Sequence, residues 1–164
     1  MLRTAILFAV IVVALFALEL TPPGQHFFVE PWTTAVARVS AAAIQLADPA
    51  VIATGAVLIS TKTGFAVAIL AGCNGVEAMI VLAAGMLAFP APWKHRIVGI
   101  LAGTVAIQAL NLVRIASLFY IGQWNRDAFE WAHLYLWQSL IMLDALVVWV
   151  LWLRSLPSPR SSAA

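Results

Sequence analysis

The sequence predicts an all-α integral membrane protein with about four transmembrane helices, an extracytoplasmic interfacial helix and a short β-hairpin. Hydrophobic residues make up 63% of its 164 residues and charged residues only 10%. A soluble domain carries roughly 25% charged residues. This apolar surplus exceeds what a core of this size can bury, so lipid must cover the remainder. Several apolar segments also approach the length of about 20 residues that crosses a bilayer.

The predicted spans are residues 4–20, 71–89, 97–121 and 135–153. Residues 1–154 are expected to form one polytopic membrane domain, and the Pro- and Ser-rich tail 155–164 to be disordered in the cytoplasm. The first span could instead be a cleaved signal peptide. However, Leu18-Glu19-Leu20 lacks the small residues of a cleavage site, so we expect a retained anchor.

Residues 21–70 are expected to lie outside the membrane. Within them, residues 32–47 are predicted to form the interfacial helix, which Asp48-Pro49 ends. Residues 51–59 and 65–70 are rich in β-branched residues and flank a Ser-Thr-Lys-Thr-Gly turn sequence, which predicts a β-hairpin. A broken membrane helix is the alternative, because short apolar runs do not distinguish the two.

The positive-inside rule gives the orientation. With the N-terminus inside, the basic residues of the cytoplasmic segments are Arg3, Lys94, Arg96, Arg154 and Arg160, and those outside are Arg38, Lys62 and Arg126. The excess on the inner side favours this topology. The net charge of +2 is too small and too scattered for a phosphate-binding face, so no nucleic-acid partner is expected.

Three polar residues from three different spans fall at nearly one depth. Counted from the inner end of each span at about 1.5 Å per residue, Cys73 lies roughly 25 Å, Arg114 about 27 Å and His133 about 31 Å up. The hydrocarbon core is about 30 Å thick, so all three are expected near the outer surface. The sequence therefore predicts a site at this depth.

These residue types fit a thiol acyl-transfer site. Cys73 stands just before an apolar helical run, where the positive end of a helix lowers a thiol pKa. A histidine can act as general acid and base, and an arginine can stabilise an oxyanion. Taken singly, each has a plainer explanation: an apolar filler, a snorkelling cation and a solvated loop residue. Either His133 or His26 could be the working base.

Charged residues inside the membrane are costly and normally have a partner. We expect Glu77 to pair with Arg114, and Asp144 to pair with Gln108 or Asn111. The polar stripe of the third span consists of Thr104, Gln108, Asn111 and Arg114.

Three blocks of the sequence resemble the exosortase/archaeosortase family. They are Gly72-Cys73-Asn74-Gly75, Asn111-Leu112-Val113-Arg114 and His133 at the start of the last span. The short chain and its Cys-Asn-Gly-Val-Glu run are most similar to the small exosortase H type. Many members read Cys-Ser-Gly, so Asn74 is a departure, and typical members are longer.

The resemblance implies a membrane-embedded cysteine protease and transpeptidase of the bacterial inner membrane, with its active site facing outside. It would cleave C-terminal sorting signals of exported proteins and transfer them to an acceptor nucleophile through a Cys73 thioester. Cys73 would be the nucleophile, His133 the general acid and base, and Arg114 the oxyanion stabiliser. The supporting residues would be Asn74, Glu77, Asn111 and Asp144.

The implied substrates carry a short C-terminal motif, a transmembrane helix and a basic end, and the acceptor is left open. The resemblance implies no cofactor and no metal. The alternatives are a non-enzymatic membrane assembly factor and a small-solute transporter subunit that uses Asp144 and Glu77 as a proton relay.

Overall fold

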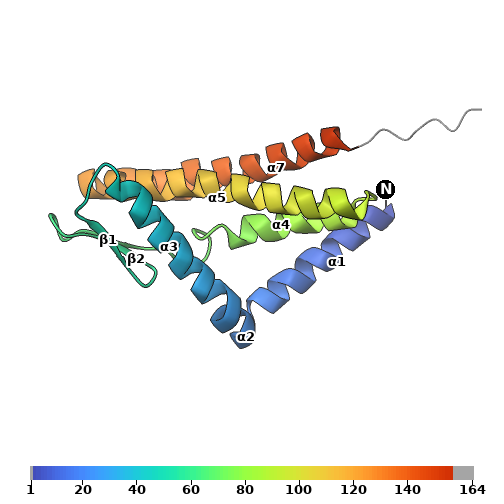
Figure 1. The fold of residues 1–164 in the computed structure, drawn as a ribbon, viewed down its shortest axis with the longest axis horizontal. Coiled ribbons are helices and arrows are strands. Elements are labelled where there is room, and N and C mark those ends of the chain that lie inside the picture. The colour runs from blue at the N-terminus through green and yellow to red at the C-terminus, as the bar shows by residue number, and fades with distance from the viewer. Residues whose placement is uncertain (1, 157–164) are drawn as a thin grey trace, which may run out of the picture.

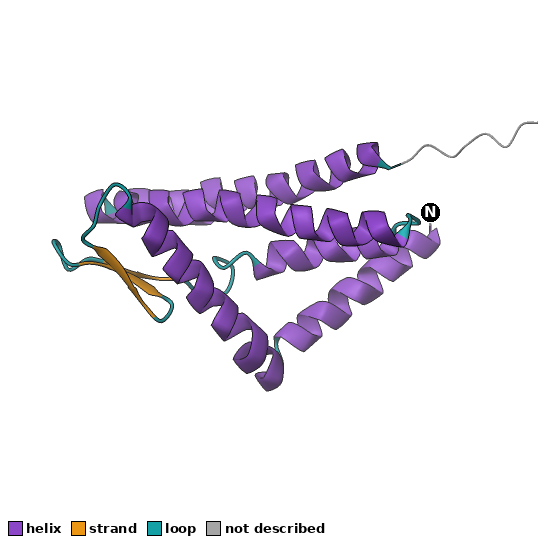
Figure 2. Cartoon of the chain, in the orientation of Figure 1, coloured by secondary structure: helices purple, strands orange, loops and turns teal. Residues whose placement is uncertain are grey.

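The structure is a computed structural model that describes residues 2–156. Its helices are α1 (Leu2–Glu19), α2 (Pro22–Gly24), α3 (Glu30–Gln45), α4 (Val76–Ala88), α5 (Trp93–Trp124), α6 (Arg126–Trp131) and α7 (Gln138–Ser155), with the π-helical segments η1 (Gln25–Val29) and η2 (Ala132–Trp137). The strands are β1 (Val51–Thr54), β2 (Val57–Ser60) and β3 (Ala66–Ala68). Helices therefore dominate the fold (Figure 2). Most of the predicted cytoplasmic tail, residues 157–164, lies outside the described residues.

Within the described residues, three helical stretches are long and apolar enough to cross a membrane: Leu2–Glu19, Trp93–Trp124 and Arg126–Ser155. The predicted second span, 71–89, holds only the 13-residue helix α4. This helix is roughly 20 Å long, which is shorter than the hydrocarbon core. It begins later than expected because Gly72 and Gly75 have positive φ angles of 81° and 79°, which a helix does not accommodate.

The long helices form a bundle from which α1 diverges (Figure 1). Helices α5 and α7 run side by side along the longest axis, and α4 packs against both. The chain turns sharply after α1, where the Thr21 hydroxyl accepts a hydrogen bond from the Gly24 N–H at 3.1 Å. Helix α3 then leads to the sheet, at the end of the molecule opposite the N-terminus. Large apolar side chains along α1 are exposed, as expected for a surface in contact with lipid.

The outer segment contains a three-stranded antiparallel sheet in the order β1-β2-β3. The predicted hairpin is confirmed between β2 and β3, where Val57 pairs with Ala68. Residues 51–59 form two strands instead of the one predicted, because Gly55 takes a φ of +58° and turns the chain. The predicted interfacial helix corresponds to α3, although the helical run begins earlier, at Pro22.

Two apolar cores lie at opposite ends of the bundle. The outer core joins α3, the sheet and the end of α5, and its buried members are Ala37, Ala41, Ile44, Val51, Leu58, Ile69, Ile115 and Phe119. The inner core joins α4, α5 and α7, and its members are Ala78, Leu82, Met86, Ile107, Ile141, Ala145 and Trp152. On α5 the polar residues between positions 108 and 114 lie between the two cores, which places them beside the loop before α4.

Candidate active site

Cys73 lies in the loop that joins β3 to α4, and Asn74 fastens this loop at two points. The buried Asn74 side chain accepts a hydrogen bond from the Val76 N–H and donates one to the Thr33 hydroxyl, both at 3.0 Å. The Trp32 indole N–H donates to the Asn74 carbonyl at 3.2 Å. Helix α3 thus holds the loop from one side. The sequence pattern alone did not single out Trp32 or Thr33, because their contacts depend on how α3 folds back.

The polar stripe of α5 holds the same loop from the other side. The amide Nε2 of Gln108 donates to the Asn74 oxygen at 3.1 Å, Nδ2 of Asn111 donates to the Cys73 oxygen at 3.0 Å, and Nη1 of Arg114 donates to the Gly72 oxygen at 3.0 Å. Residues three apart on a helix share one face, so a single face of α5 binds three successive peptide carbonyls. These bonds fix the backbone of the loop and therefore the position from which the Cys73 side chain extends.

The structure brings together the three residues that were predicted to share one depth. The Cys73 sulfur lies 3.8 Å from Nδ1 and 3.9 Å from Nε2 of His133. Nη2 of Arg114 donates to the same sulfur at 3.6 Å. The Phe129 ring, one turn before the histidine, stacks on the imidazole with a centroid distance of 5.7 Å and an interplanar angle of 4°. Stacking fixes the plane of the imidazole beside the sulfur.

The environment of the thiol differs from the one expected at a helix N-terminus. Burial in the loop raises the pKa of the Cys73 thiol, the Arg114 guanidinium opposes this increase, and the Glu77 carboxylate adds to it. The expected lowering of the pKa is therefore wrong, because desolvation outweighs the favourable charge. The thiol is protonated at rest and needs a base to become a nucleophile.

A cavity of about 520 Å³ opens beside the sulfur and the imidazole. Cys73 and His133 both line it, and its other walls are β3 and the chain around the end of α5 and the start of α6. At its rim, Arg126 and Glu130 form an exposed ion pair at 3.2 Å. Cys73 and His133 are thus accessible to a ligand from the sheet end of the molecule.

The family profile described as "Transmembrane exosortase (Exosortase_EpsH)" matches residues 2–152. The chain belongs to the transmembrane exosortase family. No curated protein and no solved structure was found to match it. The resemblance stated from the sequence is thereby confirmed, and the chain is a multi-pass membrane protein whose family points to a role in protein sorting at the membrane.

Two side-chain pairs expected in this exosortase are wrong. Glu77 accepts a hydrogen bond from the Gly72 N–H and does not pair with Arg114, which is occupied by the loop carbonyl and the sulfur. Asp144 pairs with neither amide side chain of α5, because both donate to loop carbonyls. One oxygen of the Asp144 carboxylate is buried without a hydrogen-bond partner in the described part of the chain.

The other two histidines of this exosortase lie away from the sulfur. His26 is exposed on η1, where Nδ1 lies 3.4 Å from a Glu30 carboxylate oxygen. His95 is near the start of α5, at the opposite end of the bundle from the sheet. Of the three histidines, His133 is the one whose ring nitrogens approach Cys73.

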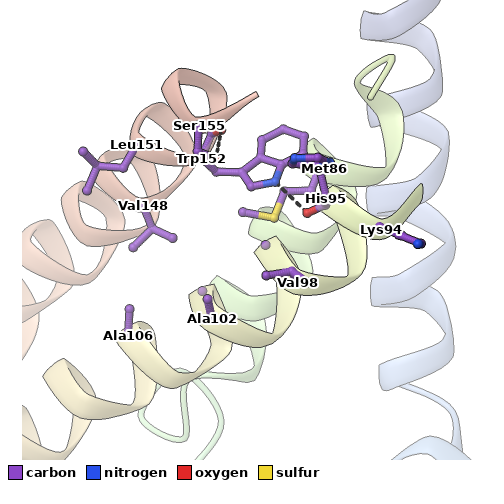
Figure 3. A pocket seen from close by; sticks show the side chains of 12 residues that line it. Met86, Lys94, His95, Val98, Ala102, Ala106, Val148, Leu151, Trp152 and Ser155 are labelled. Carbon is purple, nitrogen blue, oxygen red and sulfur yellow. Dashed lines mark hydrogen bonds between the residues drawn. The ribbon is translucent and has the colours of Figure 1, made fainter. Parts of the chain in front are cut away.

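A second cavity, of about 470 Å³, lies at the inner end of the exosortase bundle between α5 and α7 (Figure 3). The Trp152 indole N–H donates to the His95 carbonyl at 2.9 Å across this end. Small and apolar residues such as Ala102 and Val148 form most of its wall. Neither Cys73, Arg114 nor His133 lines this second cavity, so it is separate from the cluster of these three residues.

Proposed function

We propose that this exosortase is a cysteine transpeptidase that cleaves C-terminal sorting signals of exported proteins and transfers them to an acceptor. The observation that carries the proposal is the contact of one sulfur with both an imidazole and a guanidinium, at 3.6 to 3.9 Å. A thiol, a base and a fixed cation are the parts of a covalent acyl-transfer site.

The reaction begins when His133 takes the proton of the Cys73 thiol. The thiolate attacks the carbonyl carbon of the scissile peptide bond, and the resulting oxyanion carries the negative charge. The intermediate collapses as the imidazolium returns the proton to the leaving amine, and the carbonyl group remains on the sulfur as a thioester. An acceptor nucleophile then attacks the thioester, gives its proton to the imidazole and releases the thiolate, which is reprotonated.

Arg114 acts on the charge that develops in both steps. Its Nη2 is 3.6 Å from the sulfur, so the guanidinium stabilises the thiolate and then the oxyanion, which forms two bonds from the sulfur. The side chain is 2% exposed, which keeps this interaction away from the screening effect of water. In this proposal the bond to the Gly72 carbonyl keeps the cation in place through the cycle.

The site is proposed to face the outside of a bacterial inner membrane. The N-terminus, the end of α7 and the loop between α4 and α5 lie together at the other end of the molecule (Figure 1). Directly after that loop, the first turn of α5 carries the basic residues Lys94 and Arg96, which supports a cytoplasmic location under the positive-inside rule. A substrate whose C-terminal helix lies in the bilayer would then present its motif at the depth of the sulfur.

The test uses membranes that contain the full chain and an exported reporter ending in a short motif, an apolar helix and basic residues. Cys73→Ala and His133→Ala are expected to abolish cleavage of the reporter tail, whereas the matched control His26→Ala keeps it. Mass spectrometry should find a reporter fragment bound to Cys73 that hydroxylamine releases. Normal cleavage in the Cys73→Ala membranes would refute the proposal.

The transporter alternative makes the opposite prediction for two residues. If Asp144 and Glu77 relay protons, Asp144→Asn would abolish function and Cys73→Ala would not. The structure gives Glu77 a backbone partner, the Gly72 N–H, which favours a structural role for this carboxylate. Cleavage that is lost in Cys73→Ala and kept in Asp144→Asn would support the transpeptidase, whereas an unmodified chain that cleaves no reporter would favour the transporter.

A further inference from the structure

Strand β3 has an open backbone edge beside Cys73 and His133, whereas β1, the other edge strand of the sheet, does not line the outer cavity. At β1, the outward N–H of Val51 donates to the Asp48 carbonyl at 3.3 Å, and its outward carbonyl accepts from Nε2 of Gln45 at 2.7 Å. These bonds occupy the outward groups of Val51, at one end of that edge. The β3 edge borders the outer cavity instead.

The register of the hairpin shows which groups of β3 point outward. The Ser60 N–H donates to the Phe65 carbonyl at 2.9 Å, and the Ile69 N–H donates to the turn before β2 at 2.8 Å. In an antiparallel pair the bonding direction alternates from residue to residue, so Ala66 and Ala68 direct their N–H and C=O groups away from β2. Within residues 2–156, no hydrogen bond uses these outward groups.

The cavity follows this edge and ends at the sulfur. Residues 65–68 all line it, although successive side chains of a strand point to opposite faces of the sheet. A cavity that touches every one of them runs along the backbone edge and not over one face. It continues past Leu70 and Ala71 to Cys73, and Phe129 and Gly122 form part of the facing wall.

We propose that β3 binds the substrate as an added strand, through main-chain hydrogen bonds to Ala66 and Ala68. This inference rests on the proposed function and identifies how the same site takes its substrate. A strand edge with free N–H and C=O groups is complementary to an extended polypeptide, which offers donors and acceptors at the same spacing. Methyl side chains at both positions leave room for the side chains of the added strand.

The topology selects the part of the substrate that pairs. The sheet lies farther from the inner end of the bundle than the Cys73 loop does (Figure 1). A substrate anchored by a C-terminal helix runs outward from the bilayer toward its N-terminus. The segment that lies on β3 is therefore the one immediately before the scissile bond, and the carbonyl that follows it reaches the Cys73 sulfur.

Proline substitution tests the edge without disturbing the sheet. Ala66→Pro and Ala68→Pro each remove an outward N–H and no hydrogen bond to β2, and proline is tolerated at such edge positions. Cleavage of the reporter is expected to fall about tenfold or more, since the substrate loses a bond and keeps an unpaired group. The matched control is Ala53→Pro, which removes an outward N–H from β1 at the opposite edge of the sheet and should cleave normally. Alkylation of Cys73 by iodoacetamide should be unchanged in all three.

Photocrosslinking tests the binding of the substrate to β3 independently of cleavage. In the Cys73→Ala chain, a photoreactive residue replacing Ala68 should crosslink to the reporter motif, and one replacing Ile52 on β1 should not. Proline variants that fold, by the alkylation measure, and cleave normally would overturn strand binding while leaving the transpeptidase proposal intact. Absence of cleavage in the unmodified chain would refute the transpeptidase, and crosslinking at Ala68 would then decide the binding edge by itself. Equal crosslinking at Ala68 and Ile52, or no crosslinking at either, would refute the binding of the substrate to β3.

Discussion

The two halves of α5 have different structural roles. The outer half donates three side-chain hydrogen bonds to the loop that carries Cys73. The inner half uses glycine: a Cβ on Gly99 would lie 2.3 Å from the Trp152 indole, and one on Gly103 would lie 2.3 Å from a methyl carbon of Leu82. The outer half therefore positions reactive groups, while the inner half lets helices approach closely.

Substitutions in the two halves of α5 should therefore have different effects. Changes in the inner half should alter how well the bundle packs, because its contacts are apolar. Changes in the outer half should alter chemistry, because each donor there fixes one carbonyl of the reactive loop. The predictions below test this separation, on the assumption that the chain acts as the proposed transpeptidase.

The largest effect is expected at Arg114. Arg114→Lys should lower the rate of reporter cleavage at least about a hundredfold and nearly as much as Arg114→Ala. A lysine cannot bind the Gly72 carbonyl and the sulfur with two nitrogens of one planar group. Loss of one donor to a developing oxyanion typically costs about a hundredfold or more in rate. Cleavage kinetics in membranes provide the measurement. A lysine variant that keeps a third of the activity would show that only the charge matters.

Gly75→Ala should have the next largest effect. The residue has a φ of +79°, and a Cβ would lie 2.4 Å from Nε2 of Gln108, so the variant both strains the backbone and displaces a donor. The strain alone costs about 1–3 kcal/mol. Cleavage should fall at least about tenfold.

Gly55→Ala is the matched control for that variant. It has a φ of +58° and nothing within 4 Å of the added Cβ, so it carries the backbone strain alone, far from the loop. It should lower the unfolding temperature and keep the cleavage rate per folded molecule. Equal losses of cleavage in the two variants would mean that strain, and not the Gln108 contact, is responsible.

Gly99→Ala tests the inner half. The added methyl must displace the Trp152 indole, and overpacking of this kind costs typically about 1–3 kcal/mol. The unfolding temperature in detergent should fall, while iodoacetamide should alkylate Cys73 at the unchanged rate. A slower alkylation would show that the two halves of α5 are coupled, which would contradict the separation of their roles.

The smallest effect is expected in the pH dependence of alkylation. Because burial raises the pKa of the Cys73 thiol, the alkylation rate should still be increasing with pH above the ordinary thiol range. Glu77→Gln removes a charge that raises this pKa, so its curve should move to lower pH. A shift to higher pH would indicate that the lost hydrogen bond to Gly72 matters more than the charge.

The sequence predicted the shared depth of Cys73, Arg114 and His133 because helical rise is regular and each residue could be counted from a clear span end. The same regularity made the polar stripe of α5 visible. Its partners were not predictable, since they are backbone carbonyls of a loop whose shape depends on two left-handed glycines. The sequence therefore suggested pairs between charged side chains, where the structure uses peptide groups.

The outer segment was less predictable for a related reason. The pattern of β-branched residues located the strands, but Gly55 was not recognised as a turn, so two strands were predicted as one. The contacts of Trp32 and Thr33 with Asn74 join residues about forty positions apart, which no local pattern reveals. Phe129 did leave a local signal, because it stands four residues before His133 and thus on the same helical face.

Because three successive carbonyls are hydrogen-bonded to α5, the loop that carries Cys73 is held at one position along this helix. In the proposed orientation, a helix of this length and apolarity cannot shift along the membrane normal without exposing apolar side chains to water, which would keep the sulfur at one height above the bilayer centre. In the proposed reaction, the number of residues between the membrane anchor and the motif of the substrate would then be part of what is recognised. Bilayer thickness would enter the same measurement, which makes the composition of the lipid a determinant of which bond meets the sulfur.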